Sequence, residues 1–305
     1  MKELEIYLKP LIDKNAQLLT SGIKNCRDSW LFNGCSPLQL SYNLTANRPQ
    51  SATFHTASRY VQCGDNLELL KSQPNESVNM IYCDILYGTG RNFGDYQDLK
   101  PMRSEIESHY LPRLIEMHRV LNGSGTIYLQ MDLRIVHWIR VMMDDIFGYQ
   151  NFRNQIVVKF NIGGRGKREF AKKHDYIVVY TKSDNFIFND KDIRVPYRSV
   201  ISKKQDRPNI TAEKLALGTI PTNVWDDIPS GLKVKKATNY PTEKHNKIVE
   251  RCVLASSNEG DVVADYYLGS GTTAKVCQEL NRKFIGCDIS PKAIEITKAR
   301  LNGGR

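Results

Sequence analysis

Two short polar stretches, far apart in the chain, carry residue types that could build one ligand site. Residues 84–87, Asp-Ile-Leu-Tyr, close the mostly apolar run 78–83, and residues 265–273, Asp-Tyr-Tyr-Leu-Gly-Ser-Gly-Thr-Thr, close the apolar run 262–264. Each pattern is typical of a buried strand that ends in a polar loop. In a doubly wound sheet, ligands bind at the carboxyl ends of the strands. We therefore expect both stretches to line one site, as in a transferase that acts on a base.

The glycine-containing stretch is suited to a nucleotide-like cofactor. Gly269 and Gly271 permit a tight turn and a close backbone approach to a ligand, although a plain strand–helix turn would look similar. Asp288 ends the next expected strand, where an acidic side chain can accept hydrogen bonds from ribose hydroxyls. The loop has no basic residue to pair with a pyrophosphate, which favours a phosphate-free cofactor such as S-adenosylmethionine over a nicotinamide.

The acidic and aromatic stretch is suited to a planar substrate that carries an amine. Asp84 could accept a hydrogen bond from an exocyclic amine, and Tyr87 could stack on a base. The alternative structural interpretation is a helix cap followed by a core tyrosine.

The elements around these residues alternate between strands and helices from residue 59 onward. Strands are expected at 59–63, 78–83, 126–129, 156–159, 176–180, 262–267 and 283–288. Helices are expected at 66–70, 104–120, 133–147 and 243–256 and from Thr272, with Ser290 and Pro291 starting the last one. Gly123-Ser-Gly125 is expected to separate the second helix from its following strand. This alternation predicts an α/β sheet with helices on its faces.

The order of the segments predicts three regions. Residues 59–160 and 240–305 are expected to form the catalytic domain, and the irregular, basic segment 161–239 an insert. Residues 1–58 are an N-terminal extension to which the sequence assigns no role.

The positive charge is concentrated in the same irregular segment. The chain has a net charge of +10, and residues 151–247 hold 20 Lys and Arg against 10 Asp and Glu. Subtraction from the totals of 43 and 33 leaves 23 of each sign elsewhere. A basic segment beside a neutral body indicates a face that binds a polyanion, although a solvated surface is the plain alternative.

Composition excludes several other classes of protein. The apolar runs are too short for a membrane span, and residues 1–10 lack the apolar core of a signal peptide. The seven cysteines are scattered without a Cys-x-x-Cys pair, which indicates reduced thiols in a cytoplasmic protein, with no zinc site.

Taken together, these residues resemble the β-class adenine-N6 DNA methyltransferases, which include the modification enzymes of bacterial and phage restriction systems. The resemblance covers about residues 59–302 and keeps that class's circularly permuted order. It includes the stretches 124–132, 142–148 and 173–180, and Tyr240-Pro-Thr-Glu-Lys244, which is similar to a Pro-Thr-Gln-Lys element that contacts the cofactor. The fold it implies is a Rossmann-like S-adenosylmethionine-dependent methyltransferase sheet, with residues 161–239 as target-recognition insert.

The resemblance also implies a role for each site residue. The catalytic residues would be Asp84, Tyr87 and Ile85, the last through its backbone carbonyl. The cofactor-binding residues would be Asp65, Thr242, Lys244, Asp265, Tyr267, Gly269, Ser270, Gly271, Thr272 and Asp288. The residues that bind DNA phosphates would be Arg165, Lys167, Arg168, Lys203, Lys204, Lys235 and Lys236.

The sequence departs from the family pattern at four places, one of which is His245 where a proline is usual. Ile85 and Leu86 replace the two prolines of the usual Asp-Pro-Pro-Tyr tetrad, so the loop is expected to be less preorganised. Glu243 replaces the usual glutamine, and Asp265-Tyr-Tyr replaces Asp-Pro-Phe.

The function implied is site-specific transfer of a methyl group from S-adenosylmethionine to adenine N6 in double-stranded DNA after base flipping. Cytosine-N4 methylation, RNA methylation and a catalytically impaired homologue that binds DNA and cofactor stay open as alternatives. The resemblance also makes a homodimer and a cognate restriction endonuclease plausible partners, and implies no membrane.

Overall fold

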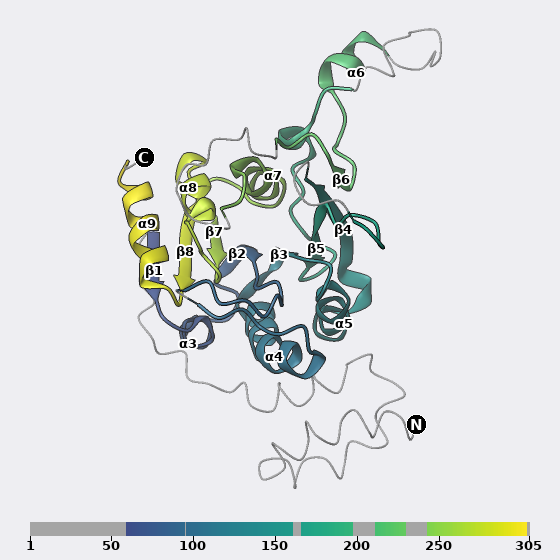
Figure 1. The fold of residues 1–305 in the computed structure, drawn as a ribbon. Coiled ribbons are helices and arrows are strands. Elements are labelled where there is room, and N and C mark those ends of the chain that lie inside the picture. The colour runs from purple at the N-terminus through teal and green to yellow at the C-terminus, as the bar shows by residue number, and fades with distance from the viewer. Residues whose placement is uncertain (1–58, 95, 161–165, 198–210, 230–242, 304–305) are drawn as a thin grey trace, which may run out of the picture. The chain divides into compact units, whose positions relative to one another are not determined.

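A computed structural model describes residues 59–94, 96–160, 166–197, 211–229 and 243–303. The expectations for residues 1–58 therefore lie outside the described residues. The described chain forms one eight-stranded sheet with helices on both faces, as the sequence predicts (Figure 1).

The strands are β1 (Arg59–Cys63), β2 (Val78–Asp84), β3 (Leu121–Met131), β4 (Phe152–Lys159), β5 (His174–Thr181), β6 (Val224–Trp225), β7 (Val262–Asp265) and β8 (Lys283–Asp288). The helices are α3 (Asn66–Ser72), α4 (Arg103–Val120), α5 (Val136–Phe147), α6 (Ala212–Leu217), α7 (Asn246–Ser256), α8 (Thr272–Glu279) and α9 (Pro291–Leu301). Two short 3-10 helices are η3 (Tyr149–Asn151) and η4 (Asp190–Ile193).

The strand order is β1-β8-β7-β2-β3-β5-β4-β6. Strand β2 pairs in parallel with both β7 and β3, while β5 runs antiparallel to β3 and β4. The loops after β2 and β7 therefore leave the same edge of the sheet, at adjacent strands. This is the juxtaposition that the two polar stretches require.

Alternate residues of the strands pack into two cores, one on each face of the sheet. Ile81 and Cys83 of β2 face the core beneath α3, α4 and α5, while Met80 and Tyr82 face the core beneath α7, α8 and α9. Figure 1 shows α4 and α5 on one side of the sheet and α7 and α8 on the other. Because both faces are covered, the central strands are apolar almost throughout.

Side-chain caps start the helices α3 and α9, and the cap at Ser290 is located where the sequence predicts it. The Asp65 carboxylate accepts a hydrogen bond from the Leu67 amide at the start of α3. Ser290 Oγ accepts one from the Ala293 amide, and Pro291 occupies the first turn of α9. Both caps follow parallel strands, so the same residues that end a strand also position the next helix.

Strand β3 is longer than expected and includes the Gly123-Ser-Gly125 stretch that was expected to precede it. The pairing with β2 jumps from Val78 opposite Leu121 to Met80 opposite Thr126, so residues 122–125 form a bulge. A Cβ on Gly125 would lie 2.8 Å from the Asn79 carbonyl oxygen. Glycine thus allows the strand to continue through the bulge, which a turn signal in the sequence does not reveal.

The segment expected as an insert contributes to the sheet. Strand β5 lies between β3 and β4, and β6 extends the sheet beyond β4. Residues 174–181 and 224–225 of the expected insert therefore belong to the catalytic sheet.

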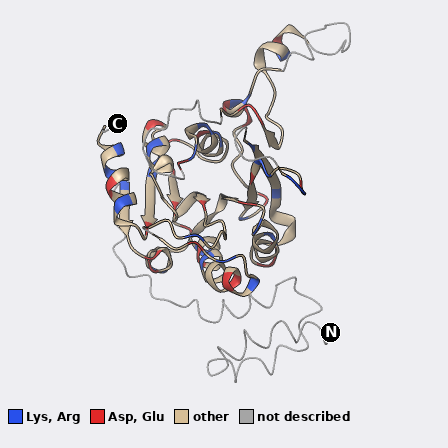
Figure 2. Cartoon of the chain, viewed as in Figure 1, with Lys and Arg blue, Asp and Glu red and all other residues tan. Residues whose placement is uncertain are grey.

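Charge on the described body is mixed in sign. Figure 2 shows acidic and basic residues interspersed on α4 and α9, in agreement with the balanced composition outside the basic segment. Across the described ranges, none of the helices combines the length and apolar character that crossing a membrane requires.

Candidate functional site: the cavity at the ends of β2 and β7

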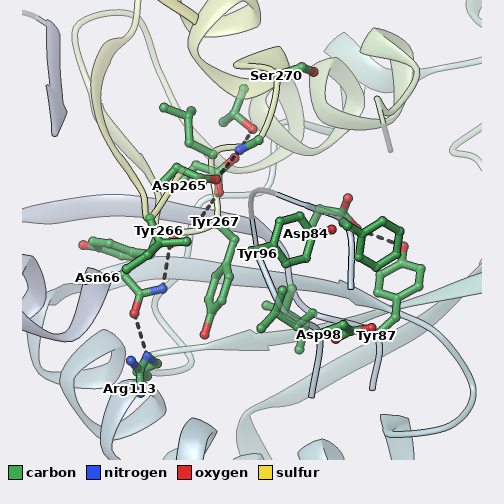
Figure 3. A pocket seen from close by; sticks show the side chains of 18 of the residues that line it. Asn66, Asp84, Tyr87, Tyr96, Asp98, Arg113, Asp265, Tyr266, Tyr267 and Ser270 are labelled. Carbon is green, nitrogen blue, oxygen red and sulfur yellow. Dashed lines mark hydrogen bonds between the residues drawn. The ribbon is translucent and has the colours of Figure 1, made fainter. Parts of the chain in front are cut away.

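A cavity of about 510 Å³ opens at the carboxyl ends of the parallel strands. Its lining includes the end of β2, the loop that follows it, the β7–α8 loop and the ends of β1 and β8. Figure 3 shows Asp84 and Tyr87 on one side of this cavity and Asn66 and Arg113 on the other, with the Tyr267 ring between them. The two polar stretches identified in the sequence thus meet in one site.

The side of the cavity that contains Asp84 holds a compact group of charges. Lys244 Nζ lies 3.4 Å from Asp84 Oδ1, 3.1 Å from Asp175 Oδ2 and 2.5 Å from the Tyr87 hydroxyl oxygen. The Tyr87 hydroxyl lies 2.9 Å from Asp84 Oδ1 and 2.6 Å from Asp175 Oδ2. All four side chains are largely enclosed, so their mutual interactions are strong.

Burial and charge together set the ionisation of Asp84. Burial raises the pKa of its carboxyl to about 6, with Asp175 adding to the rise and the Lys244 ammonium and Tyr87 opposing it. Burial alone would lower the pKa of Lys244, but the two carboxylates raise it. Above pH 6, Asp84 is therefore a carboxylate beside the Lys244 ammonium ion.

The two residues that replace the family's prolines are held by hydrogen bonds. The Ile85 amide donates to the Gln130 carbonyl of β3 at 3.0 Å, a contact that proline has no hydrogen to make. The Leu86 carbonyl accepts from the Tyr110 hydroxyl of α4 at 2.9 Å. Ile85 is also buried. These contacts anchor the loop to β3 and α4 at the two positions where the family has proline rings.

The β7–α8 loop is organised around the Asp265 carboxylate. It accepts hydrogen bonds from the Tyr267 amide at 3.0 Å and from the Thr273 hydroxyl at 2.6 Å. Burial raises the pKa of Asp265 to about 7, against the lowering effect of these two donors. Gly271 has φ +75°, and a Cβ there would lie 2.5 Å from Thr297 Oγ1. Glycine is required at this turn by both conformation and space.

The side of the cavity that contains Arg113 joins three elements through polar contacts. Asn66 donates to the Tyr266 carbonyl, and Arg113 of α4 donates to Asn66 at 2.6 Å and to Asp65 at 2.8 Å. The Tyr267 hydroxyl lies 3.0 Å from His109 Nε2. Burial, assisted by Arg113, lowers the pKa of His109 to about 4, so this histidine is neutral at physiological pH.

The lining of the cavity fits S-adenosylmethionine better than a phosphorylated nucleotide. The carboxylates of Asp65 and Asp288 line the same cavity as the backbone of Gly269. Asp288 is oriented by the Gly269 and Ser290 amides, at 2.8 and 2.9 Å. Among the described lining residues the lysines and arginines are Arg113 and Lys244, and both are paired with carboxylates. A pyrophosphate would therefore meet carboxylates without a cation available to bind it.

Most of the predicted site residues that the structure describes line this cavity. They are Asp65, Asp84, Ile85, Tyr87, Lys244, Asp265, Tyr267, Gly269, Ser270, Thr272 and Asp288. Gly271 shapes the turn instead of lining the cavity, and Thr242 lies outside the described residues. Lys244, predicted to bind the cofactor, lies against the Asp84 carboxylate, so we place it at the end of the cavity where the substrate would lie.

Few of the residues predicted to bind DNA fall in described parts of the chain. Lys167 and Arg168 are exposed in the connection between β4 and β5. Arg165, Lys203, Lys204, Lys235 and Lys236 lie outside the described residues.

Sequence reasoning missed Asp175, Gln130 and Arg113 as members of the site. Asp175 is a buried acid within an otherwise apolar strand, and Arg113 lies beside the apolar stripe of α4. A charged residue at a position expected to be buried is the signal that would have indicated both. Gln130 is polar and fully buried in β3, and its amide donates to Asp175 Oδ2 at 2.9 Å.

Known proteins share this fold. The PvuII DNA methyltransferase (cytosine-N4-specific) superposes with a TM-score of 0.57 at 16% identity, covering 81% of this chain and 94% of that one. The M1.HpyAVI–SAM complex superposes with a TM-score of 0.53 at 19% identity, covering 80% and 99%. At these identities the likeness concerns the fold alone.

Sequence comparison extends the relationship to the family. The Type II methyltransferase M.HpaI of Haemophilus parainfluenzae is 35% identical over 246 residues, which span 79% of this chain and 73% of that protein. The DNA adenine methyltransferase YhdJ of Escherichia coli (strain K12) is 29% identical over 257 residues, 82% and 84% of the two chains. A family model described as DNA methylase matches residues 78–299. The chain therefore belongs to this family of N6- and N4-amino methylases and is a DNA methyltransferase that uses S-adenosylmethionine.

Proposed function

We propose that this methyltransferase acts on the N6 amine of adenine in double-stranded DNA. The observation that carries the proposal is the state of the Asp84 carboxylate. Within the described residues its Oδ1 receives both the Tyr87 and Lys244 contacts, and Oδ2 receives none. A carboxylate oxygen is therefore available in the cavity to accept a hydrogen bond from an amine.

Similarity supports adenine as the base. The relative from Escherichia coli named as a DNA adenine methyltransferase aligns with most of both chains. Cytosine-N4 enzymes usually carry serine at the position of Asp84. A serine hydroxyl is a weaker acceptor than an ionised carboxylate, so Asp84 favours the adenine assignment.

The walls of the cavity suit a planar base that has left the duplex. Phe93 and Tyr96 line it and stack on each other with ring centroids 5.0 Å apart. The Lys244 ammonium lies over the Tyr87 ring, 4.6 Å from its centroid. We infer that a flipped adenine contacts this aromatic surface. The contact would offset part of the free energy, about a few kcal/mol, that is needed to unstack the base from the duplex.

The protein's contribution to the reaction is positioning and charge. When bound, S-adenosylmethionine supplies an activated methyl group on its sulfonium. Asp84 Oδ2 would accept one amine hydrogen, and the Ile85 carbonyl the other, so that the nitrogen lone pair points at the methyl carbon. The Lys244 ammonium and the buried surroundings fix the direction of that carboxylate. Asp65 and Asp288 would hold the nucleoside part of the cofactor. The positive charge that passes from the sulfonium to the amine nitrogen during the transfer stays within the cavity.

Recognition of DNA is proposed for the basic segment. Lys167 and Arg168 are exposed beside the sheet, as phosphate-contacting residues must be. A homodimer would let two such segments hold both sides of a site, and sedimentation with and without DNA tests that expectation.

Product analysis tests the proposed base. The purified protein is incubated with S-adenosylmethionine and unmethylated DNA or RNA, and the nucleosides are separated by mass spectrometry. N6-methyladenine in DNA is expected, and it should disappear with Asp84→Ala. N4-methylcytosine would overturn the assignment of the base, methylation of RNA alone would overturn DNA as the substrate, and cofactor binding without any product would indicate an impaired homologue.

A further inference from the structure

We propose that Phe170 inserts into the DNA duplex, where its ring takes the place that the target base leaves when it turns out of the stack. Phe170 is then a positioning residue, which acts on the base without touching the reacting atoms. The inference rests on the proposed methylation of a base in double-stranded DNA. It adds a residue that lies outside the cavity and outside the motifs of the sequence.

Phe170 is the most exposed of the large apolar side chains in the described ranges. It is 99% exposed, and the next most exposed, Tyr149, is 71% exposed. Single exposed apolar residues are common on protein surfaces, so exposure alone assigns no role. The location of Phe170 does, because its loop leaves the sheet beside the active site.

The loop that carries Phe170 lies at the edge of the sheet where the cavity opens. Strands β3 and β4 both run antiparallel to β5, so β4 ends at the same edge as β3 and β2. At the stem of the loop Lys159 pairs with His174, and the Phe160 amide donates to the Lys173 carbonyl at 2.8 Å. The stem is therefore an extension of the sheet, and it directs the loop away from that edge.

The same stem connects the loop to the charged group of the active site. Asp175 directly follows the stem, and its Oδ2 accepts from the Tyr87 hydroxyl at 2.6 Å and lies 3.1 Å from Lys244 Nζ. Phe170 is five positions before Asp175, and five extended residues span at most about 18 Å. The ring is therefore close to the point where a base leaves the duplex to enter the cavity.

The residues around Phe170 favour DNA as its partner. Residues 166–173 hold one acid, Glu169, and four basic residues, which are Lys167, Arg168, Lys172 and Lys173. Glu169 Oε1 lies 3.1 Å from Lys172 Nζ, so its charge is compensated within the loop. Cations on both sides of an apolar ring match the phosphates on both sides of a base step. A single ring is too small for a stable protein interface, which buries about 800 Å² per partner.

Insertion of the ring would assist the step that precedes methyl transfer. A base that turns out of the duplex loses its stacking and leaves a gap, and proteins that distort DNA place phenylalanine and other apolar side chains between bases. Phe93 and Tyr96 line the cavity that receives the base, whereas Phe170 would fill the gap behind it. The ring should therefore matter for a paired target base and matter little for one that is already unpaired.

Single-turnover rates on two duplexes test the insertion. One duplex pairs the target adenine with thymine, and the other has an abasic site opposite the adenine, so that less energy is needed to turn it out. Phe170→Ala should lower the rate at least tenfold on the paired duplex and at most twofold on the unpaired one. Phe170→Trp keeps an aromatic ring and should stay within threefold of wild type on both.

Tyr149→Ala is the matched control. Tyr149 is also an exposed aromatic residue, but it lies in η3 just before β4 begins, at the opposite edge of the sheet. Its removal should leave both rates unchanged. Because both side chains are exposed, the midpoint of thermal denaturation should also be unchanged in each variant.

Fluorescence gives two readouts that need no turnover. 2-Aminopurine at the target position brightens when it leaves the stack, and Phe170→Ala should reduce this rise at least twofold. The tryptophan of Phe170→Trp should be quenched on binding the duplex, because its ring stacks on bases. Tyr149→Trp should show no such quenching beyond that of the three native tryptophans.

The outcomes separate this inference from the assignment of the base. Paired-duplex rates of Phe170→Ala within threefold of wild type, or equal losses on both duplexes, would overturn the insertion even if adenine is methylated. Methylation of cytosine by the wild type would overturn the base assignment alone, and the same comparison then decides the insertion with cytosine as the target. Methylation confined to RNA would overturn both.

Discussion

At the scale of single residues, the charge of Asp84 controls the site. Its pKa of about 6 lies above the ordinary range because of burial, so lowering the pH below 6 converts it to a neutral acid that can no longer accept the amine hydrogen. We expect the methylation rate to be constant above about pH 7 and to fall roughly tenfold per pH unit below 6. A single-turnover rate profile from pH 5 to 9 checks this, with cofactor affinity measured at each pH. A rate unchanged at pH 5 would contradict the account.

A second prediction for single residues concerns Lys244 and the pH at which the methylation rate falls. Its ammonium lowers the pKa of Asp84, so Lys244→Gln should move the acidic midpoint of the profile to higher pH. The rate at neutral pH should fall at least tenfold, because Asp84 then ionises less readily. Lys275→Gln on the surface of α8 is the control and should leave the midpoint in place. A midpoint that stays fixed or moves down in Lys244→Gln would show that the ion pair does not set the charge.

At the scale of elements, the turn between β7 and α8 depends on Gly271. Gly271→Ala would force a side chain into a left-handed conformation and against Thr297. Gly260 has φ +82° but open space around it, so Gly260→Ala isolates the conformational cost of about 1–2 kcal/mol. We expect Gly271→Ala to lose about 1–3 kcal/mol more in denaturant unfolding because of the overpacking. It should also weaken cofactor binding in calorimetry. Equal losses of unfolding free energy in the two variants would mean that the Thr297 side chain moves aside without loss of stability.

A buried ion pair fixes the segment that carries Lys244. Arg300 of α9 lies 3.1 Å from Glu243, with side chains 6% and 4% exposed, and also donates to the Ser270 carbonyl. This arginine accounts for glutamate at a position where the family usually has glutamine. Arg300→Leu should cost about 3–5 kcal/mol of unfolding free energy, because the buried Glu243 carboxylate loses the guanidinium beside it. Arg300→Leu combined with Glu243→Leu should recover most of that loss, and no recovery would argue against the pairing.

The elements also show how far sequence reasoning reaches. Strands β1 and β8 match the predicted bounds, because alternation and caps are local signals. Local patterns also predict that Asp84 and Asp265 lie where apolar strands end, so that both can line one site. Asp175 contacts Tyr87 across 88 positions in the chain, and β3 continues through a bulge where Gly125 packs against the Asn79 carbonyl. Such contacts arise from tertiary pairing, so neither apolar periodicity nor a turn signal predicts them.

At the scale of the whole molecule, the separation of charge predicts how DNA binds. The body carries equal numbers of both signs, and the net positive charge belongs to the segment that includes Lys167 and Arg168. Lys167→Gln should weaken DNA binding and reduce the slope of log affinity against log salt by about 0.9. Lys298→Gln, exposed on α9, is the control and should leave the slope unchanged. Equal changes in the two variants would mean that attraction is spread over the body.

The central claim is that the Asp84 cavity methylates adenine within a specific DNA sequence. The most direct test is to express the protein in a bacterial host that lacks DNA methylation and to read modified bases across the genome by single-molecule sequencing. The account predicts one sequence motif modified at adenine N6 in nearly every copy, and no modification with Asp84→Ala. Modification at cytosine N4, or adenine methylation that persists with Asp84→Ala, would contradict it.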